Sequence, residues 1–366
     1  MTPDSLFDQK IAWSGRPKVV VCPPMYRLAA LVMGVISAIT TASAIVVATA
    51  LEHNPGSQLA FAAWSAILAV GLYQGPKWWL GEFEYVVTDR LVFIKRGQFR
   101  RTMDRSAISY ARIHWSPDHP GIGDLELVRA VPTGALRRRL SIVLTGVVAP
   151  DRIWAIIRGI TPATPAGDGE RLLAQRLDDG ERVLWSGQPP NHWGKWIPSN
   201  GRAWAGLGLG LLMGFASVFI AFRAVHAVGT VTKGGMDPHS IQYYALVTSL
   251  VLTILLMAGA ALFVVYGSVI HPARVQSETR YWVTDRRVLI QCGDHELHLE
   301  RTHIVDTIES PVPGGLQDLF FVLDGPRARA FASSGAFGER DIEGLQPVFH
   351  RIAKADADNV RGILKG

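Results

Sequence analysis

The sequence is short of cysteine, of charge and of recognisable catalytic motifs. Of 366 residues, 2 are cysteines and 19% are charged. Two distant thiols, Cys22 and Cys292, define no disulfide framework, and no Cys/His spacing resembles a zinc site. The sequence has no Walker-type phosphate loop, no His-Glu-x-x-His, no Gly-x-Ser-x-Gly and no dinucleotide fingerprint. We therefore expect no catalytic residues, no metal and no cofactor.

Charge is also missing from four long apolar runs. They cover residues 28–51, 59–76, 203–222 and 243–270. A helix needs about 20 mostly apolar residues to cross the hydrocarbon core of a bilayer. The runs therefore predict four transmembrane helices in two hairpins, residues 28–80 and 203–270. The first run is longer than the apolar core of a secretory signal, so we expect no cleaved targeting segment.

Basic residues flank the outer ends of these hairpins. The connector 52–58 has no lysine or arginine, and the connector 223–242 has only Arg223 and Lys233. The positive-inside rule then predicts a multi-pass protein of the cytoplasmic (inner) membrane with both termini in the cytoplasm. Up to residue 165 the chain has 18 lysines and arginines against 11 aspartates and glutamates, and the remainder has 19 against 20. The basic first half favours membrane lipids over nucleic acid as a partner.

Small residues recur at every fourth position in two of the runs. Such a groove lets another helix approach closely. We interpret these residues as helix-packing positions, either within the bundle or on a dimer or partner face. They are Gly34, Ala38 and Ala42 in the first run, and Gly206, Gly210 and Gly214 in the third.

Two motifs occur in the same order around each hairpin. Trp-Ser-Gly-x-Pro precedes the hairpins at 13–17 and 185–189, and Tyr-x-Val-Thr-Asp-Arg follows them at 85–90 and 281–286. The match continues in register through Gly97 and Gly293, and through Arg105 and Arg301. This repetition predicts a tandem duplication. We expect the strand before each hairpin to belong to the domain after it.

The segment after each hairpin predicts short strands and a closing helix. Runs of β-branched and aromatic residues are divided by polar turns, which predicts β-hairpins. A closing helix is expected from Pro150 in the first half. In the second half, the spacing of Leu345, Phe349 and Ile352 predicts its counterpart. The expected structural turns are Thr88, Asp89 and Arg90, and Thr284, Asp285 and Arg286.

These motifs together resemble the bacterial pleckstrin-homology-like membrane proteins, as does Gly-Ile-Gly-Asp-Leu at 121–125. The resemblance covers most of both halves, but the second half departs from it with Gly-Gly-Leu-Gln-Asp at 314–318. It implies a membrane α+β protein with four transmembrane helices in two hairpins. Each hairpin would be inserted into a small β-barrel or sandwich of the pleckstrin-homology type, capped by a C-terminal helix.

The expected organisation follows from the repeat. The first domain has its first strand in 1–27, its hairpin in 28–80 and its main part in 81–160. A linker at 161–182 leads to the second domain. Its first strand and neck are expected in 183–202, its hairpin in 203–270, its main part in 271–353 and a tail in 354–366.

A cluster of histidines and glutamates is the nearest approach to a metal site. His295, His298 and His303 surround Glu296 and Glu300. Residues three apart on a strand point to opposite faces, so His295 and His298 should diverge. We interpret these histidines as solvated strand residues rather than ligands.

The most suggestive surface feature is basic. Its core is expected in a loop between two strands, and each basic residue near an anionic leaflet contributes roughly 1 kcal/mol of binding. Three interpretations stay open: a solvated basic hairpin, contact with lipid headgroups, and contact with an acidic protein partner. The residues are Arg137, Arg138 and Arg139, with Arg96, Arg100 and Arg101 on the same face.

The hypothesis that best fits is a non-catalytic membrane-anchored scaffold or adaptor. It would bind a protein partner, or a second copy of itself, and assist membrane-complex assembly at the cytoplasmic face. Binding or sensing of anionic lipid is the alternative. A transporter or membrane enzyme is disfavoured because the four runs have no ionisable group beyond tyrosine. No small-molecule substrate is indicated.

Overall fold

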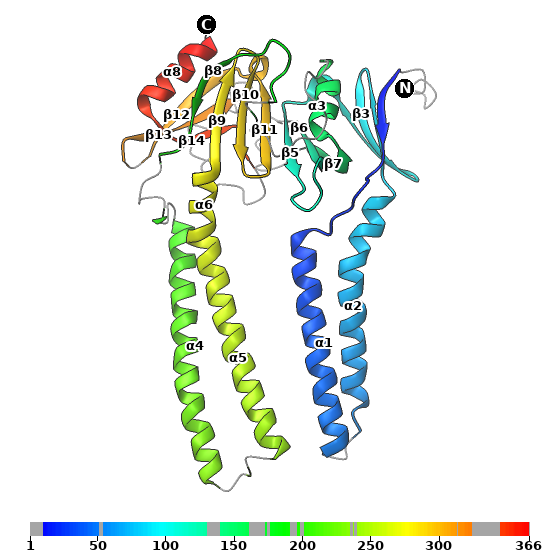
Figure 1. The fold of residues 1–366 in the computed structure, drawn as a ribbon, viewed down its shortest axis with the longest axis vertical. Helices are drawn as coiled ribbons and strands as arrows, with labels where there is room; N and C mark the ends of the chain where they lie inside the picture. The colour runs from blue at the N-terminus through cyan, green and yellow to red at the C-terminus, as the bar shows by residue number, and fades with distance from the viewer. Residues whose placement is uncertain are drawn as a thin grey trace. The chain divides into compact units, whose positions relative to one another are not determined.

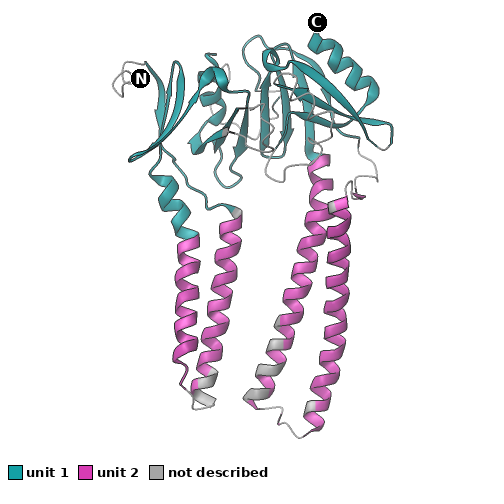
Figure 2. Ribbon diagram, turned by 180° about the vertical axis from the view of Figure 1, so that it is seen from behind, with its two compact units in different colours: residues 1–24, 73–190, 277–366 teal, residues 25–72, 191–276 magenta. Residues whose placement is uncertain are grey.

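The computed structural model describes residues 10–50, 54–129, 140–160, 173, 176–190, 196–197, 201–234, 237, 240–312, 314–323 and 345–365. This part of the chain is a mixed α+β protein with long apolar helices and antiparallel sheets (Figure 1). It divides into two compact units (Figure 2). One unit, residues 1–24, 73–190 and 277–366, contains all of the described strands. The other, residues 25–72 and 191–276, is helical.

Four helices in the described residues contain a segment long and apolar enough to cross a membrane. The fourth continues without a break through a π-helical turn, Tyr266–Ile270, into α6, His271–Glu278. The expectation of four membrane-length apolar helices is therefore confirmed. The helices are α1 (Pro24–Ala50), α2 (Gly56–Gly81), α4 (Gly201–Lys233) and α5 (Ile241–Val265).

The two stripes of small residues have different surroundings. A Cβ atom added at Gly210 would lie 2.7 Å from Cγ2 of Val265 and 3.3 Å from the carbonyl oxygen of Ala261. The stripe of Gly206, Gly210 and Gly214 on α4 therefore faces the other helix of its own hairpin. A Cβ at Gly34 would have no described atom outside its own helix within 4 Å, and Ala38 and Ala42 on α1 are exposed.

The first half of the strand-bearing unit contains two groups of strands and a helix. β1, which precedes the first helix pair, pairs antiparallel with β2, which follows it, with Trp13 opposite Val87. The strand before the hairpin thus belongs to the sheet after it. The sheet order is β1 (Ile11–Gly15), β2 (Glu84–Thr88), β3 (Leu91–Arg96) and β4 (Phe99–Asp104). The other strands are β5 (Tyr110–Trp115), β6 (Ile122–Arg129) and β7 (Leu140–Val148), followed by α3 (Pro150–Arg158).

The second half has the same order of elements. β8 pairs with β9 across the second helix pair, with Trp185 opposite Val283. Its strands are β8 (Val183–Gly187), β9 (Thr279–Thr284), β10 (Arg287–Cys292), β11 (His295–Glu300), β12 (Asp306–Val312), β13 (Leu316–Val322) and β14 (Val348–Ala353). The helix expected around Leu345, Phe349 and Ile352 is wrong, because residues 348–353 form β14. The closing helix is instead α8 (Lys354–Lys365), where a tail was expected.

The two halves share one sheet. Its strand order is β7-β6-β5-β11-β10-β9-β8, so strands from both halves meet where β5 pairs with β11. The pairs at this point include His114 opposite His295 and Ala111 opposite His298. The expectation of two separate barrels is therefore corrected: the described strands form sheets of four, seven and three strands, and none closes into a barrel.

Equivalent arginines brace both halves. Arg105 donates from Nη1 to the carbonyl oxygens of Thr88 and Asp89, both at 3.1 Å, and from Nε to Ile157 O at the end of α3 at 2.8 Å. Arg301 does the same in the second half, donating to Asp285 O at 3.2 Å and to Ile363 O in α8. The turns between β2 and β3 and between β9 and β10 are thereby tied to the closing helices.

Candidate functional site

The β5–β11 pairing brings different chemistry to the two faces of the shared sheet. On one face, Ile113 and Trp115 of β5 belong to the hydrophobic core of the first half. Glu296 lies opposite Ile113 on that face, and His298 lies opposite Ala111. Side chains alternate along a strand, so this face of β11 is polar where the neighbouring face of β5 is apolar.

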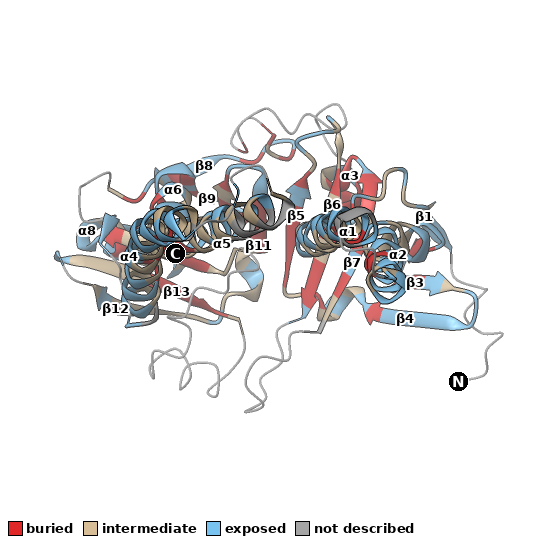
Figure 3. Cartoon of the chain, turned by 90° about the horizontal axis from the view of Figure 1, so that it is seen from below, coloured by how far each residue is buried: buried red, intermediate tan, exposed pale blue. Residues whose placement is uncertain are grey.

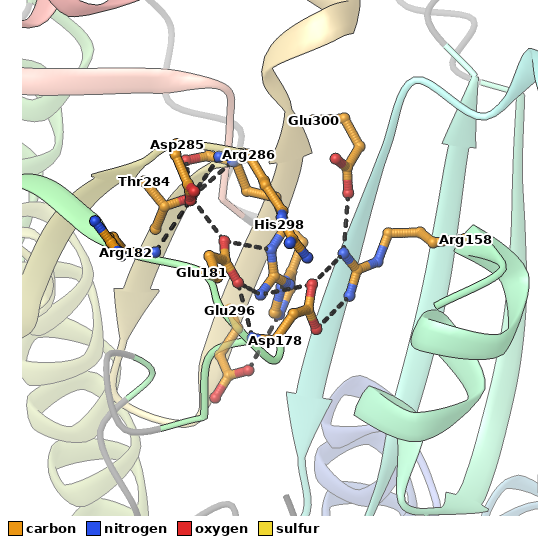
Figure 4. Close-up of polar contacts among 11 residues, drawn as sticks. Arg158, Asp178, Glu181, Arg182, Thr284, Asp285, Arg286, Glu296, His298 and Glu300 are labelled. Atoms are coloured by element: carbon orange, nitrogen blue, oxygen red, sulfur yellow. Dashed lines mark hydrogen bonds and ion pairs between the residues drawn. The ribbon is translucent and has the colours of Figure 1, made fainter. Parts of the chain in front are cut away.

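A segment between α3 and β8 covers this polar face. Leu173 packs on Trp282 and Leu289 of the shared sheet, and the Leu173 backbone N–H donates to Gln291 Oε1 at 3.1 Å. Residues 176–181 then place charged side chains over β10 and β11. The result is a buried group that we call the junction cluster. It consists of Arg158, Arg176, Asp178, Glu181, Arg287, Glu296, His298 and Glu300. Figure 4 labels six of them: Arg158, Asp178, Glu181, Glu296, His298 and Glu300.

Arg287 is the centre of one side of the junction cluster. Its guanidinium donates to both carboxylate oxygens of Glu181 and lies 3.3 Å from Asp178 Oδ2. Its side chain is 3% exposed and that of Glu181 is 0% exposed. Burial would raise the pKa of the Glu181 carboxyl, but the hydrogen bond and charge of Arg287 outweigh it, so the pKa lies below its usual value. Both groups are therefore charged at neutral pH.

Glu296 is the centre of the other side. Its carboxylate accepts from Trp115 Nε1 at 2.9 Å, from the guanidinium of Arg176 and from His298 Nε2 at 3.3 Å. Burial would raise the Glu296 pKa, but the hydrogen bond of His298 and the charge of Arg176 lower it below its usual value. Trp115 comes from the first half and Glu296 from the second, so this carboxylate joins the halves through a side chain.

The contacts of His298 determine its tautomer. Arg287 Nη1 lies 3.2 Å from His298 Nδ1, and because a guanidinium only donates, Nδ1 must accept. Nε2 then carries the proton and donates to Glu296. Burial lowers the pKa of His298, so the ring is neutral. His298 therefore links the Arg287 and Glu296 sides of the cluster without adding a charge.

Arg158 extends the cluster to the end of α3. It donates to Asp178 Oδ2 at 2.6 Å, to Asp178 Oδ1 at 3.0 Å and to Glu300 Oε1 at 3.2 Å. Burial would raise the pKa of Asp178, but Arg158 and Arg287 hold it below its usual value. At Glu300 burial prevails over the charge of Arg158, so the Glu300 pKa is raised. A helix of the first half, the connecting segment and β11 are thus held by one arginine.

The interpretation of the histidines changes accordingly. His295 and His298 do lie on opposite faces, as expected, but His298 is buried rather than solvated. His295 stacks on His114 across the junction, with ring centroids 4.0 Å apart. His303 Nδ1 donates to Ser109 O at 3.1 Å. Among the described residues, no group of three His, Cys, Asp or Glu side chains could hold a metal ion.

The junction cluster connects the two halves through side chains of both. A pocket of about 140 Å³ lies beside the β5–β11 pairing, and its lining includes His114, Asp124, His295 and Glu296. Desolvation costs several kcal/mol per ion, so buried ion pairs are weak evidence of net stability. Through Trp115, Arg158 and Arg176, the cluster connects β5, α3 and the connecting segment to β11. The two halves consequently present one continuous sheet.

The basic residues expected at a surface are partly described. Arg137, Arg138 and Arg139 lie outside the described residues. Arg96, in β3, is already engaged, since it pairs with Glu82 at 2.8 Å and lies over the Trp79 ring. Arg100 and Arg101 are exposed on β4, where Arg100 lies over the Phe93 ring. Of the six arginines expected at this surface, the two that are described as exposed thus lie on β4.

β4 is also the end strand of its sheet. It pairs with β3 on one side, and within the described residues no strand pairs with its other side. Five of its six residues are exposed, whereas β5 is almost wholly buried (Figure 3). A strand edge of this kind presents free backbone N–H and C=O groups that can accept another strand.

Sequence reasoning missed the connecting segment altogether. Residues 161–182 were expected to be a linker, yet Arg176, Asp178 and Glu181 are among the most buried charged residues of the chain. A usable signal was present: acidic residues at 178, 179 and 181 directly precede the second Trp-Ser-Gly motif, and β10 contains an arginine at 287 where β3 has Leu91. A charge in a strand that is otherwise apolar calls for a buried partner.

Comparisons of the chain with protein-family models, with curated proteins and with solved structures find no match.

Proposed function

We propose that the chain is a tandem-duplicated, non-catalytic scaffold of the cytoplasmic membrane, anchored by its four apolar helices. It would bind a partner protein by accepting an extended segment at the open edge of β4. The observation that carries the proposal is the β5–β11 pairing, because it shows a strand edge at the same place in the second half accepting a strand.

The geometry of β4 fits this role. β3 and β4 are joined by a two-residue hairpin whose closing pair is Arg96 and Phe99. In such a hairpin the closing pair bonds inward, so Phe99 and Arg101 direct their N–H groups to β3. Arg100 and Thr102 then direct theirs to the open edge. An acidic extended peptide would form ladder bonds there and meet two arginines.

Anionic lipid is the alternative occupant of this surface, and a paired experiment separates the two. A photo-crosslinking amino acid is placed at Phe99 in the full chain in native membranes, with the exposed turn residue Arg90 as the control position. Strand addition predicts protein adducts at Phe99 that are lost with Thr102→Pro, which removes an outward N–H. The matched variant Arg100→Gln with Arg101→Gln should weaken them only partly.

Lipid contact predicts the opposite pattern, since a headgroup needs charge and not the backbone ladder. Lipid adducts that survive Thr102→Pro and vanish in the double glutamine variant would replace the scaffold proposal. Protein adducts that persist in the Thr102→Pro variant would show that β4 does not bind by strand addition. That result would also refute the scaffold proposal.

A further inference from the structure

The second half has an open strand that is the counterpart of β5. β5 and β12 each follow a short 3-10 turn, Arg105–Ala107 and Arg301–His303, and each starts a three-strand group. β5 pairs with β11, whereas β12 pairs only with β13 among the described strands. β4, the counterpart of β11, is open as well. Among the described strands, the internal junction therefore leaves two edges without a partner: that of β4, the counterpart of β11, and that of β12, the counterpart of β5.

We propose that the occupant of the β4 edge is β12 of a second copy of this chain. This inference rests on the proposed function and names its partner. An interface between two different surfaces of repeated units is heterologous, and it leaves one matching surface at each end of the chain. A second copy can then repeat between chains the junction that β5 and β11 make within one.

The internal junction predicts the register. In the strands that follow each helix pair, the repeated residues up to β5 and β12 are 196 positions apart, as at Gly97 and Gly293, which both begin two-residue hairpins with φ of +54° and +56°. The internal pairs join residues 295–298 to 114–111 in antiparallel order. We subtract 196 from the residue numbers of β11 and add 196 to those of β5. The predicted register then places residues 99–102 of one copy opposite residues 310–307 of the other.

The predicted pairs are complementary in charge. Arg100 lies opposite Glu309, and opposite charges directly across a strand pair are favourable. The Glu309 carboxylate accepts from Arg361 in α8, and its side chain is 18% exposed, so pairing with Arg100 would add a second cation to a half-buried ion pair. The basic excess of the first half and the acidic residues of β12 are also opposite in charge, which favours the same pairing.

The composition of β12 also limits the pairing. Pro311 corresponds to Trp115, whose backbone N–H donates to Asp294 O at 2.9 Å next to the internal pairs. Proline has no N–H, so this bond has no counterpart between copies. The predicted ladder therefore ends at Ser310 and contains the same number of residue pairs as the internal one.

Engineered disulfides test the register directly. In the full chain in detergent, with Cys22→Ala and Cys292→Ala, one tagged copy carries Phe99→Cys and a differently tagged copy carries Ser310→Cys. By analogy with the internal pair His114 and His295, this pair has no ladder bonds and its Cα atoms should lie about 4.5 Å apart, within reach of a disulfide. We expect a disulfide between the two tags on mild oxidation. Thr102→Cys with Ser310→Cys is the control, since these positions are three residues out of register and should crosslink at least tenfold less.

Charge reversal provides the second measurement. Arg100→Glu in the first copy, or Glu309→Arg in the second, should reduce the disulfide yield at least fivefold, and combining the two should restore it. Equal yields for the matched and control cysteine pairs would overturn the inference. So would reversals that fail to restore each other.

The outcome also separates this inference from the proposed function. If the photo-crosslinker at Phe99 gives adducts with another protein that are lost with Thr102→Pro, and the cysteine pair gives none, the scaffold stands and self-pairing is refuted. If neither experiment gives a product at β4, both proposals fail together.

Discussion

β4 and β11 occupy the same position in the two halves but have different surroundings. β11 is nearly buried along its length, while β4 is exposed except at Met103. The difference coincides with charge, since β4 has Arg100 where β11 has Glu296. The Glu296 carboxylate accepts hydrogen bonds from Trp115, Arg176 and His298, whereas the Arg100 guanidinium lies over the Phe93 ring. The comparison teaches that equivalent strand edges with different flanking charges differ in pairing: β11 pairs with β5, and β4 has no second partner among the described strands.

The strongest way to break the comparison is to open the junction at Arg287. Arg287→Met leaves the buried carboxylate of Glu181 without its cation, and it leaves Asp178 with Arg158 alone. Removing one partner of a buried ion pair costs about 3–5 kcal/mol. We expect the free energy of opening of β10 and β11, measured by amide hydrogen exchange in micelles, to fall by that amount, so that β11 comes to resemble β4.

An exposed ion pair of the same unit is the matched control. Arg16 lies 3.8 Å from Glu84, and the two side chains are 73% and 42% exposed. Arg16→Met should change the opening free energy by about 0.5 kcal/mol or less. A comparable loss from both variants would show that the junction cluster has no special role.

Two tryptophans allow a sharper test of the link between the halves. Trp115→Phe removes the N–H that reaches Glu296 across the junction and should cost about 1–3 kcal/mol, because a buried carboxylate loses a donor. Trp154 is also buried, but its Nε1 has no partner among the described residues. Trp154→Phe should therefore cost well under 1 kcal/mol. Hydrogen exchange at β5 and β11 measures both, and equal effects would contradict the assigned role of Trp115.

The turns that precede β4 and β11 should behave alike. Gly97 and Gly293 both have positive φ, which costs an alanine roughly 1–2 kcal/mol. Gly97→Ala and Gly293→Ala should thus lower the free energy of opening of their hairpins by similar amounts, as measured by hydrogen exchange. An effect at one turn alone would place the difference between the halves in the hairpin instead of the strand edge.

The parts of this architecture that depend on local pattern could be predicted from the sequence. Uncharged runs marked the four long helices, and the Tyr-x-Val-Thr-Asp-Arg motif marked the β2–β3 and β9–β10 hairpins. The end of the chain was misassigned because Leu345, Phe349 and Ile352 fit a helical spacing, whereas Phe349 and Ile352 lie in β14, opposite Leu319 and Gln317 of β13. A spacing of three or four residues does not exclude a short buried strand.

The junction itself could not be predicted in this way. It depends on β5 and β11, which are about 180 residues apart, and on Arg176 and Glu181 in a segment with no periodic pattern. The ion pairs of the cluster join residues distant in sequence, such as Glu296 with Arg176. His298 had no local feature that distinguished a buried ring from a solvated one. Long-range pairing of polar groups is invisible to any window of neighbouring residues.

Lowering the pH should change the difference between β11 and β4 least of all. The pKa values of Asp178, Glu181 and Glu296 are lowered in the folded chain, so their stabilisation is complete above their ordinary pKa values and is lost as pH falls through the lowered ones. The pKa of His298 is lowered below its ordinary value of 6.5. Below that pH the unfolded state binds a proton that the folded state does not, so His298 also makes the junction weaker in acid. The raised pKa of Glu300 acts in the opposite direction.

The effect of His298 comes first as pH falls, because its ordinary value is the highest of the group. We expect the opening of β5 and β11, corrected for intrinsic exchange, to increase several-fold between pH 7.5 and pH 5.5, while that of β4 stays constant. His298→Gln is the matched variant, since its amide can accept from Arg287 and donate to Glu296 but does not titrate. An unchanged pH response in this variant would assign the sensitivity to the carboxylates. No response in the native chain would mean that acid does not weaken the junction in this range. None of the charged residues of the junction cluster lies on β4, so acid should leave the opening of β4 unchanged. The opening of β11 should rise toward that of β4.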